Sequence, residues 1–199
     1  MDVRREDADL IAASLDDPAQ FELVFDRHYD AIHRYLARRG GWELAEDLAQ
    51  SVFLAGFEGR RRFRPSGTSA APWLFGIATN LLRRHARTEL RRLRAYARLP
   101  VREVAPFDVN AVVDRLDAAS AGPRAFELVA RLPEGERNAL LLVAWADLTY
   151  EQVAVALNVP VGTVRSRIHR ARGKLRELLG PNGQDRDMNA RATERANDG

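Results

Sequence analysis

The chain carries, at residues 160–175, the stretch PVGTVRSRIHRARGKL, which joins four arginines and a lysine to regularly spaced apolar residues. Spacings of 4, 3, 4 and 3 connect Val164, Ile168, Ala171, Leu175 and Leu178. Such spacing places these side chains in one stripe along an α-helix. Opposite the stripe, or flanking it, lie the polar residues Thr163, Arg165, Ser166, Arg167, His169 and Arg170. The stretch therefore predicts a helix with one face on a core and a basic face turned outward.

A shorter helix is predicted immediately before it. Thr149 and Gln152 have the spacing of a capping box, and the segment 158–160 (Asn-Val-Pro) ends the run. Two helices joined by a tight turn, the second of them basic, are typical of the helix-turn-helix, whose second helix enters the major groove of DNA. A structural helical hairpin with a solvated basic face remains the alternative.

The remaining chain also reads as helices, so the predicted fold class is all-α. Helices are predicted from Asp16-Asp17-Pro18 to Gly40-Gly41, over about 42–57 and over about 70–97, with a loop at 59–67. We expect two small helical domains, 1–98 and 123–180. A flexible acidic linker (99–122) joins them, and a disordered polar tail (181–199) follows.

Composition excludes several classes of protein. The chain of 199 residues has no cysteine, no long apolar run and no apolar signal segment, which predicts a cytoplasmic protein without membrane insertion. Its four histidines, at positions 28, 33, 85 and 169, show no metal-ligand spacing, and no glycine-rich phosphate loop is present. We therefore expect no metal, no cofactor and no catalytic residues; a helical enzyme would need a constellation that the sequence lacks.

Charge is strongly segregated along the chain. Residues 59–98 carry a net charge of +10 and residues 160–180 a net +5, whereas residues 1–58 carry −7. Two separate basic blocks on an otherwise acidic chain indicate binding to a phosphate backbone. Two solvated helix faces are the alternative, although such faces normally mix signs and the first block contains one acid, Glu89.

Three runs of sequence resemble the bacterial sigma-70 family, in its extracytoplasmic-function (ECF) group. The runs 45–53 (AEDLAQSVF) and 72–80 (PWLFGIATN) resemble sigma region two, and the run 132–172, with LTYEQVA and GTVRSRIHRAR, resembles sigma region four. The resemblance implies a transcription initiation factor that binds core RNA polymerase and directs it to promoter DNA.

The resemblance also implies roles for individual residues. Asp47, Gln50 and Ser51 would bind the clamp helices of the polymerase β′ subunit, and the apolar surface of region four would touch the β flap. Asp47 and Gln50 share one helix face, away from the apolar stripe, as docking needs. An anti-sigma factor is the further partner that the resemblance implies.

Promoter contacts are implied on both domains. Phe63 and Arg64 in the loop would hold an unstacked base, because strand opening needs an aromatic or guanidinium platform. The minus-ten element would meet Asn80, Arg83, Arg84 and Arg87. The minus-thirty-five element would meet Thr163, Arg165, Ser166, Arg167 and Arg170. Many family members have an acid where this chain has Arg84, which puts its minus-ten base preference in question.

Two alternatives remain at the level of sequence. A helix-turn-helix regulator with a helical sensing or dimerisation domain would use only the carboxyl-terminal motif, but it gives no reason for the +10 block over 59–98.

Trp73 is expected to pack in the core with Leu74 and Ile77, the alternative being a wedge into DNA.

Overall fold

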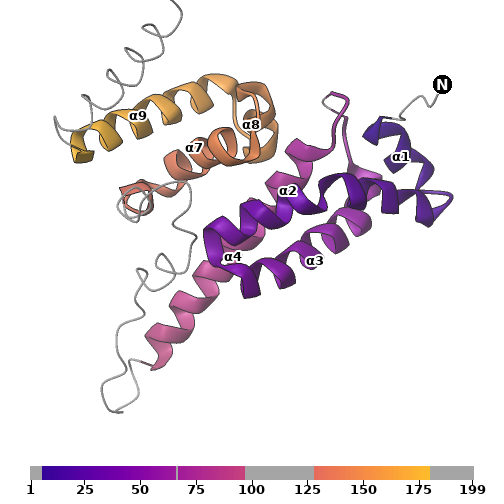
Figure 1. The fold of residues 1–199 in the computed structure, drawn as a ribbon, viewed down its shortest axis with the longest axis horizontal. Helices are drawn as coiled ribbons and strands as arrows, with labels where there is room; N and C mark the ends of the chain where they lie inside the picture. The colour runs from indigo at the N-terminus through magenta and orange to yellow at the C-terminus, as the bar shows by residue number, and fades with distance from the viewer. Residues whose placement is uncertain (1–5, 66, 97–127, 180–199) are drawn as a thin grey trace, which may run out of the picture.

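The computed structural model describes residues 6–65, 67–96 and 128–179, and this part of the chain contains helices and no strand (Figure 1). The all-α prediction is confirmed for it, while the predicted linker (99–122) and tail (181–199) lie outside the described residues. The amino-terminal unit comprises α1 (Asp7–Ala13), the 3₁₀ helix η1 (Pro18–Phe21), α2 (Glu22–Gly40), α3 (Trp42–Gly59), the 3₁₀ helix η2 (Arg60–Arg62) and α4 (Ala71–Tyr96). The carboxyl-terminal unit comprises α7 (Glu134–Ala146), α8 (Tyr150–Leu157) and α9 (Val161–Leu179).

The amino-terminal unit is a bundle in which α2, α3 and α4 pack on one another. Gly41 lets the chain reverse between α2 and α3, because its φ of +84° is a conformation that side chains disfavour. Helical spacing then turns one apolar face of each helix inward. The largest fully buried side chains of the unit are Leu10, Ile11, Val24, Ile32, Tyr35, Leu36, Val52 and Leu74.

The carboxyl-terminal unit contains the predicted helix-turn-helix in α8 and α9. The capping box is present: the Gln152 N–H donates to Thr149 Oγ1 (3.3 Å), and the Thr149 N–H donates to Gln152 Oε1 (2.9 Å). Asn158 ends α8 in the left-handed region, with φ of 51°, which an Asn side chain tolerates. The chain therefore turns tightly into α9.

The apolar stripe of α9 is confirmed over most of its length. Val164, Ile168 and Ala171 are buried, and Leu175 is half-buried. The prediction is wrong for Leu178, which is 40% exposed. Lys174 already pairs with Glu136 in the first turn of α7, so Leu178, one turn later, lies beyond that turn.

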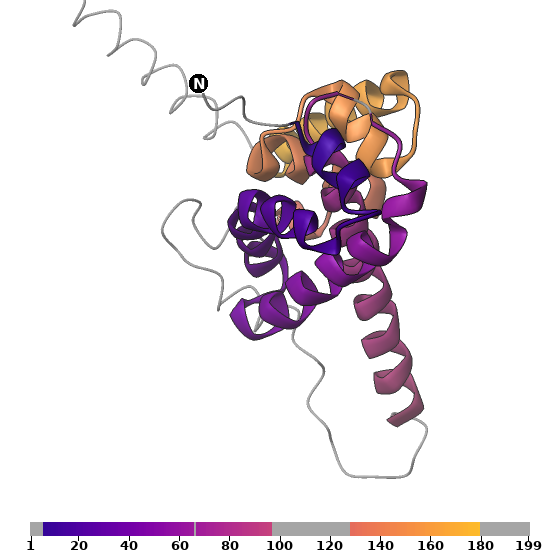
Figure 2. The same ribbon diagram turned by 90° about the vertical axis from the view of Figure 1, so that its right-hand side faces the viewer.

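The two units lie against each other, with α4 packed on α8 and α7, and α2 packed on α7 (Figures 1 and 2). Their buried side chains form one continuous hydrophobic cluster. The backbones approach closely at Gly76 of α4, where an added Cβ would lie 2.6 Å from the Ala156 carbonyl oxygen. We call this packing of the two units against each other the closed arrangement. The sequence predicts two domains but not this contact between them.

Candidate functional site

The outer face of α3 carries the three residues predicted to bind polymerase. Asp47, Gln50 and Ser51 are all exposed, opposite the buried Leu48 and Val52. The Ser51 hydroxyl donates to the Asp47 carbonyl oxygen (2.9 Å), so it is partly occupied within the helix. Because Asp47 and Gln50 project into solvent, the face is available to a partner.

Two large exposed apolar side chains of α3 were missed by sequence reasoning: Leu54, on the face of Gln50 and Ser51, and Trp42, at the first position of the helix. Trp42 is 64% exposed and Leu54 is 59% exposed. Exposed aromatic and aliphatic side chains among acids are typical of a protein interface. For Leu54, its spacing of three and four residues from Ser51 and Gln50 was a signal that could have placed it on their face.

Glu46 links the first turns of α3 to α2. The Tyr29 hydroxyl donates to Glu46 Oε2 (3.2 Å), and His33 Nε2 lies 3.5 Å from the same oxygen. Burial and the nearby Glu46 charge raise the pKa of Tyr29 above its ordinary value of 10.0. The Trp42 ring packs on His33 with 4.8 Å between ring centroids, which fixes one end of the exposed face.

The loop after α3 holds Phe63 and Arg64, the predicted base-capturing pair. Arg64 is exposed, whereas Phe63 is half-buried and packs on the Trp73 ring at 4.9 Å between centroids. Trp73 also lies beside Gly56 and Gly59 of α3. These contacts agree with the packing role expected for Trp73 and give the loop a fixed aromatic support.

The predicted minus-ten face of α4 is exposed at all four positions, Asn80, Arg83, Arg84 and Arg87. Arg83 Nη2 donates to Asn80 Oδ1 (2.9 Å), and Arg83 Nε lies 3.9 Å from Glu134 Oε1 on the other unit. Asn80 and Arg83 therefore face α7, while Arg84 and Arg87 follow along α4, whose carboxyl-terminal part extends past the bundle (Figure 2).

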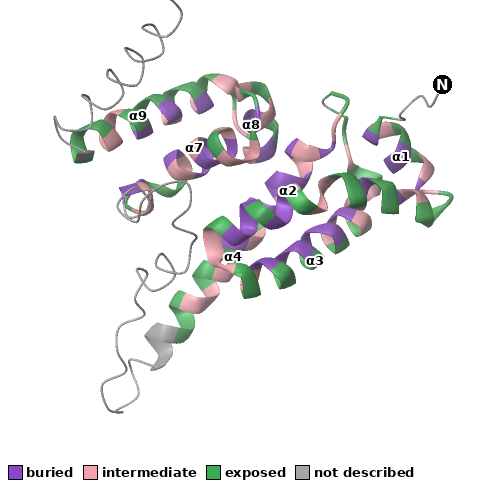
Figure 3. Cartoon of the chain, in the orientation of Figure 1, coloured by how far each residue is buried: buried purple, intermediate pink, exposed green. Residues whose placement is uncertain are grey.

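The predicted minus-thirty-five residues of α9 fall into two groups. Arg165 and Ser166 are exposed on the side away from the buried stripe, and Thr163 is half-buried at its edge (Figure 3). Arg167 is half-buried and its side chain lies beside Gly135 of α7. Arg170 is exposed, although its Nε lies 3.3 Å from Glu136 Oε1.

Two arginines on α9 were not among the predicted contacts. Arg172 and Arg176 are exposed, as is His169. With Arg165 and Ser166 they follow helical spacing along one side, so the outward basic ridge is longer than predicted. Counting from Arg165 in steps of three and four would have found it.

Glu136 holds α9 against α7. Its carboxylate is buried and accepts hydrogen bonds from Lys174 Nζ at 3.1 and 2.9 Å, and Arg170 lies beside it. A buried carboxylate needs such partners. Arg170 therefore has a structural role in addition to the DNA role that was predicted for it.

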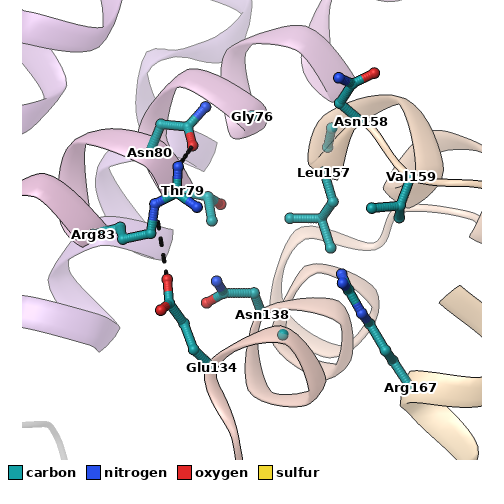
Figure 4. A pocket seen from close by; sticks show the side chains of 12 residues that line it. Gly76, Thr79, Asn80, Arg83, Glu134, Asn138, Leu157, Asn158, Val159 and Arg167 are labelled. Carbon is teal, nitrogen blue, oxygen red and sulfur yellow. Dashed lines mark hydrogen bonds and ion pairs between the residues drawn. The ribbon is translucent and has the colours of Figure 1, made fainter. Parts of the chain in front are cut away.

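A cavity of about 550 Å³ lies between the two units (Figure 4). Asn80 and Arg83 of α4 line one side, and Arg167 of α9 lines the other, with Glu134 and Asn138 of α7 between them. Three residues predicted to bind DNA, from two different units, thus line the same pocket, which opens to solvent. In the closed arrangement Asn80 and Arg83 stay exposed to solvent, and Arg167 is half-buried.

A polar network crosses from one unit to the other. The Tyr35 hydroxyl lies 3.1 Å from Thr79 Oγ1, and Arg39 donates to both the Tyr35 hydroxyl (2.7 Å) and Asn138 Oδ1 (2.8 Å). Nearby, the Arg38 guanidinium lies 5.8 Å from the centroid of the Trp145 ring. The closed arrangement is thus held by specific polar contacts as well as by apolar packing.

The same region contains a repulsion. Burial lowers the pKa of Arg137, and the charge of Arg39 lowers it further, against the opposing influence of Glu134 and Tyr35. Arg137 Nη1 donates to the Ala130 carbonyl (2.9 Å), which keeps the guanidinium in place. The like charges of Arg39 and Arg137 thus repel each other at the contact between the units.

Within the described residues, no group of three or more His, Cys, Asp or Glu side chains could hold a metal ion. In the same part of the chain, no helix is long and apolar enough to cross a membrane.

Comparison with known families assigns both units. Residues 24–97 match the family model for sigma-70 region 2, and residues 125–175 match the model for sigma-70, region 4. A regulator that shared only the helix-turn-helix with sigma factors would not match the region 2 model.

Individual relatives cover most of the chain. It is 36% identical over 162 residues to RNA polymerase sigma factor CarQ of Myxococcus xanthus, which covers 80% of this chain and 89% of CarQ. It is 33% identical over 179 residues to ECF RNA polymerase sigma factor SigM of Mycobacterium tuberculosis, covering 88% of this chain and 86% of SigM.

Two solved structures share the fold. One is the sigma factor RpoE in complex with the anti-sigma factor NepR from Bartonella quintana (TM-score 0.60, 23% identity, 80% of this chain and 96% of that chain). The other is CnrH in complex with the cytosolic domain of CnrY (TM-score 0.59, 25% identity, 87% and 96%). The chain belongs to the sigma-70 family of RNA polymerase sigma factors, in the ECF group, and is a transcription initiation factor.

Proposed function

We propose that this sigma factor uses three surfaces in initiation: the outer face of α3 for core polymerase, the loop and α4 for the minus-ten element, and the outer ridge of α9 for the minus-thirty-five element. The observation that carries the proposal is that two basic helix faces lie on separate units, while an acidic and apolar face lies on a third surface. Such a chain contributes no catalysis of its own and works beside chromosomal DNA in the cytoplasm.

Promoter-directed run-off transcription with purified core polymerase tests the whole proposal. We expect the polymerase to start at defined sites on DNA of the source genome only when this protein is added. Initiation that is absent at every tested promoter, or that does not depend on the protein, would contradict it.

The α9 ridge makes a distinct prediction about DNA affinity. If Arg165 reads a base, Arg165→Ala should weaken binding to minus-thirty-five duplex by about 1–3 kcal/mol. If Arg165 contacts a phosphate, the substitution should make the slope of log K against log salt concentration less steep by about one. Titration of labelled duplex at several salt concentrations measures both quantities. Arg131→Ala, an exposed arginine just before α7, is the matched control. Equal affinity and slope for both variants would remove Arg165 from the interface.

The α3 face makes a prediction about polymerase. Asp47→Ala with Gln50→Ala should weaken core binding by about 1.4 kcal/mol or more, roughly tenfold, because both side chains lie at the centre of the exposed face. Competition for core polymerase against labelled wild-type protein measures this change. Asp26→Ala removes an exposed acid from α2 and should bind as the wild type does; equal losses in the two proteins would point to net charge alone.

We infer that the two units separate when both bind promoter DNA. Asn80, Arg83 and Arg167 line the cavity of the closed arrangement, and α4 and α8 are in contact. Core polymerase would stabilise the open form by binding both units, and an anti-sigma factor would favour a form in which the polymerase-facing surfaces are covered. The complexes of RpoE with NepR and of CnrH with CnrY support including such a partner.

A further inference from the structure

Helix α1 contacts η2, at the start of the loop between α3 and α4 that carries Phe63 and Arg64. It lies outside residues 24–97, the part of the chain that matches region 2. Leu10 and Ile11 anchor it in the core. Asp7, at its first position, is 4% exposed. A buried carboxylate at the start of a peripheral helix needs partners, and those partners indicate what the helix does.

The Asp7 carboxylate joins α1 to two other elements. Its Oδ2 accepts hydrogen bonds from the Ala70 N–H (2.7 Å) and from His28 Nε2 (2.6 Å), and its Oδ1 accepts one from Arg27 Nη1 (2.9 Å). The Asp7 N–H donates in turn to the Thr68 carbonyl (3.2 Å). Asp7 therefore ties the end of the loop, just before α4, to both α1 and α2.

The start of the loop is tied to the same part of the chain. Arg60 Nε donates to the Ser14 carbonyl at the end of α1 (3.3 Å), and Arg60 Nη1 donates to the Phe57 carbonyl (2.6 Å). The Arg60 guanidinium also stacks over the Phe57 ring at 3.7 Å from its centroid. Both ends of the segment that carries Phe63 and Arg64 are thus fastened to α1.

The Asp7 contacts depend on an ionised carboxylate. Burial alone would raise the pKa of Asp7, but the hydrogen bonds from His28, Ala70 and Arg27 and the charge of His28 together lower it well below the ordinary value of 3.8. Asp7 therefore keeps its acceptor role at neutral pH.

We propose that α1 is a brace: it holds in place both ends of the loop between α3 and α4, which carries Phe63 and Arg64 and is proposed to open the promoter. Asp7 is the positioning residue of this brace. Fixing both ends of the loop before DNA arrives removes part of the ordering entropy that capture of an unstacked base would otherwise cost. The inference rests on the proposed role of Phe63 and Arg64 in that capture. It extends the functional surface of the amino-terminal unit to a helix that the family match does not cover.

The test compares Asp7→Asn with Asp9→Asn, an exposed acid in the same first turn of α1, in the full chain. Asp7→Asn should speed hydrogen exchange of the backbone amides over 60–72, Ala70 above all, and Asp9→Asn should not. Bound to core polymerase, Asp7→Asn should form open complexes about tenfold less well by permanganate reactivity and bind single-stranded minus-ten DNA correspondingly more weakly. Affinity for core polymerase and for minus-thirty-five duplex should stay within about twofold.

A second pair of variants guards against simple misfolding. His28→Gln keeps a donor toward Asp7 and should behave as the wild type does, whereas His28→Leu removes the donor and should share the opening defect. Unchanged loop exchange in Asp7→Asn, or equal losses of core binding and strand opening, would overturn the brace.

The double variant Phe63→Ala, Arg64→Ala separates the brace from the loop assignment on which it rests. If that variant cannot open promoters and Asp7→Asn can, the brace is wrong and the loop assignment holds. If the double variant opens promoters normally, the proposed role of Phe63 and Arg64 is wrong, and the proposed role of α1, which rests on it, is wrong as well.

Discussion

Gly76→Ala will drive the two units apart while leaving each of them folded. The added Cβ would lie 2.6 Å from the Ala156 carbonyl oxygen and 3.3 Å from its carbonyl carbon and Cα, all backbone atoms of the other unit. Such overpacking costs about 1–3 kcal/mol. Within α4 itself, alanine is a better helix former than glycine by about 1 kcal/mol. The substitution therefore penalises the closed arrangement alone.

Energy transfer between two dyes measures the separation. The chain has no cysteine, so cysteines introduced at the exposed positions Asp26 and Arg176 label α2 and α9 specifically. We expect lower transfer efficiency in Gly76→Ala than in the doubly labelled parent. Gly173→Ala, whose added Cβ meets nothing within 4 Å, is the matched control. Equal efficiencies in the two variants would show that the closed arrangement does not form in solution.

The same variant should bind single-stranded minus-ten DNA more tightly than the parent does. Separation frees Arg83 from Glu134 of the other unit, which lies 3.9 Å away, and removes α7 from beside Asn80. A protein that must first open binds with an affinity reduced by the fraction that is open, so removing that requirement raises the apparent affinity. If separation by energy transfer is seen without tighter binding, occlusion of α4 does not limit promoter capture.

The largest loss of stability is expected for Ile168→Ala. Ile168 is 2% exposed and lies in the middle of the buried stripe of α9, and removing such a side chain costs about 2–5 kcal/mol. The carboxyl-terminal unit is small, and small units have little stability to lose. We expect its helix-turn-helix to unfold at low denaturant and initiation dependent on the minus-thirty-five element to be lost.

Chemical denaturation followed by circular dichroism measures this change. Leu178→Ala removes a similar apolar side chain from the same helix at an exposed position, and it should shift the midpoint little. A loss below about 1 kcal/mol in Ile168→Ala would contradict the packing described for α9.

Much of the local structure follows from sequence because its causes are local. The capping box depends on Thr149 and Gln152, three residues apart, and the turn after α8 depends on Asn158. The buried stripe of α9 follows from helical spacing, until the helix runs past its partner at Leu178. Within the described residues, exposure of the predicted polymerase and minus-ten faces was foreseeable for the same reason.

The contacts that sequence reasoning missed join residues far apart in the chain. Periodicity places Arg39 on a helix but cannot pair it with Asn138. Helix α1 was not predicted, so neither was the contact between Asp7 and Ala70. The ion pair of the exposed Arg170 likewise depends on Glu136, a residue of another helix. Helical spacing fixes which side of a helix is apolar, whereas the partner of each polar group is decided by tertiary packing.

The intrinsic fluorescence of the three tryptophans can report changes at three different places in the protein. Trp42 is exposed on the α3 face, Trp73 lies under Phe63, and Trp145 lies near Arg38 at the contact between the units. Indole emission shifts to shorter wavelength when the ring leaves water. A chain that keeps only Trp42 would therefore signal docking of a partner on α3. One that keeps only Trp73 would follow the loop, and one that keeps only Trp145 would follow opening, each without an attached dye.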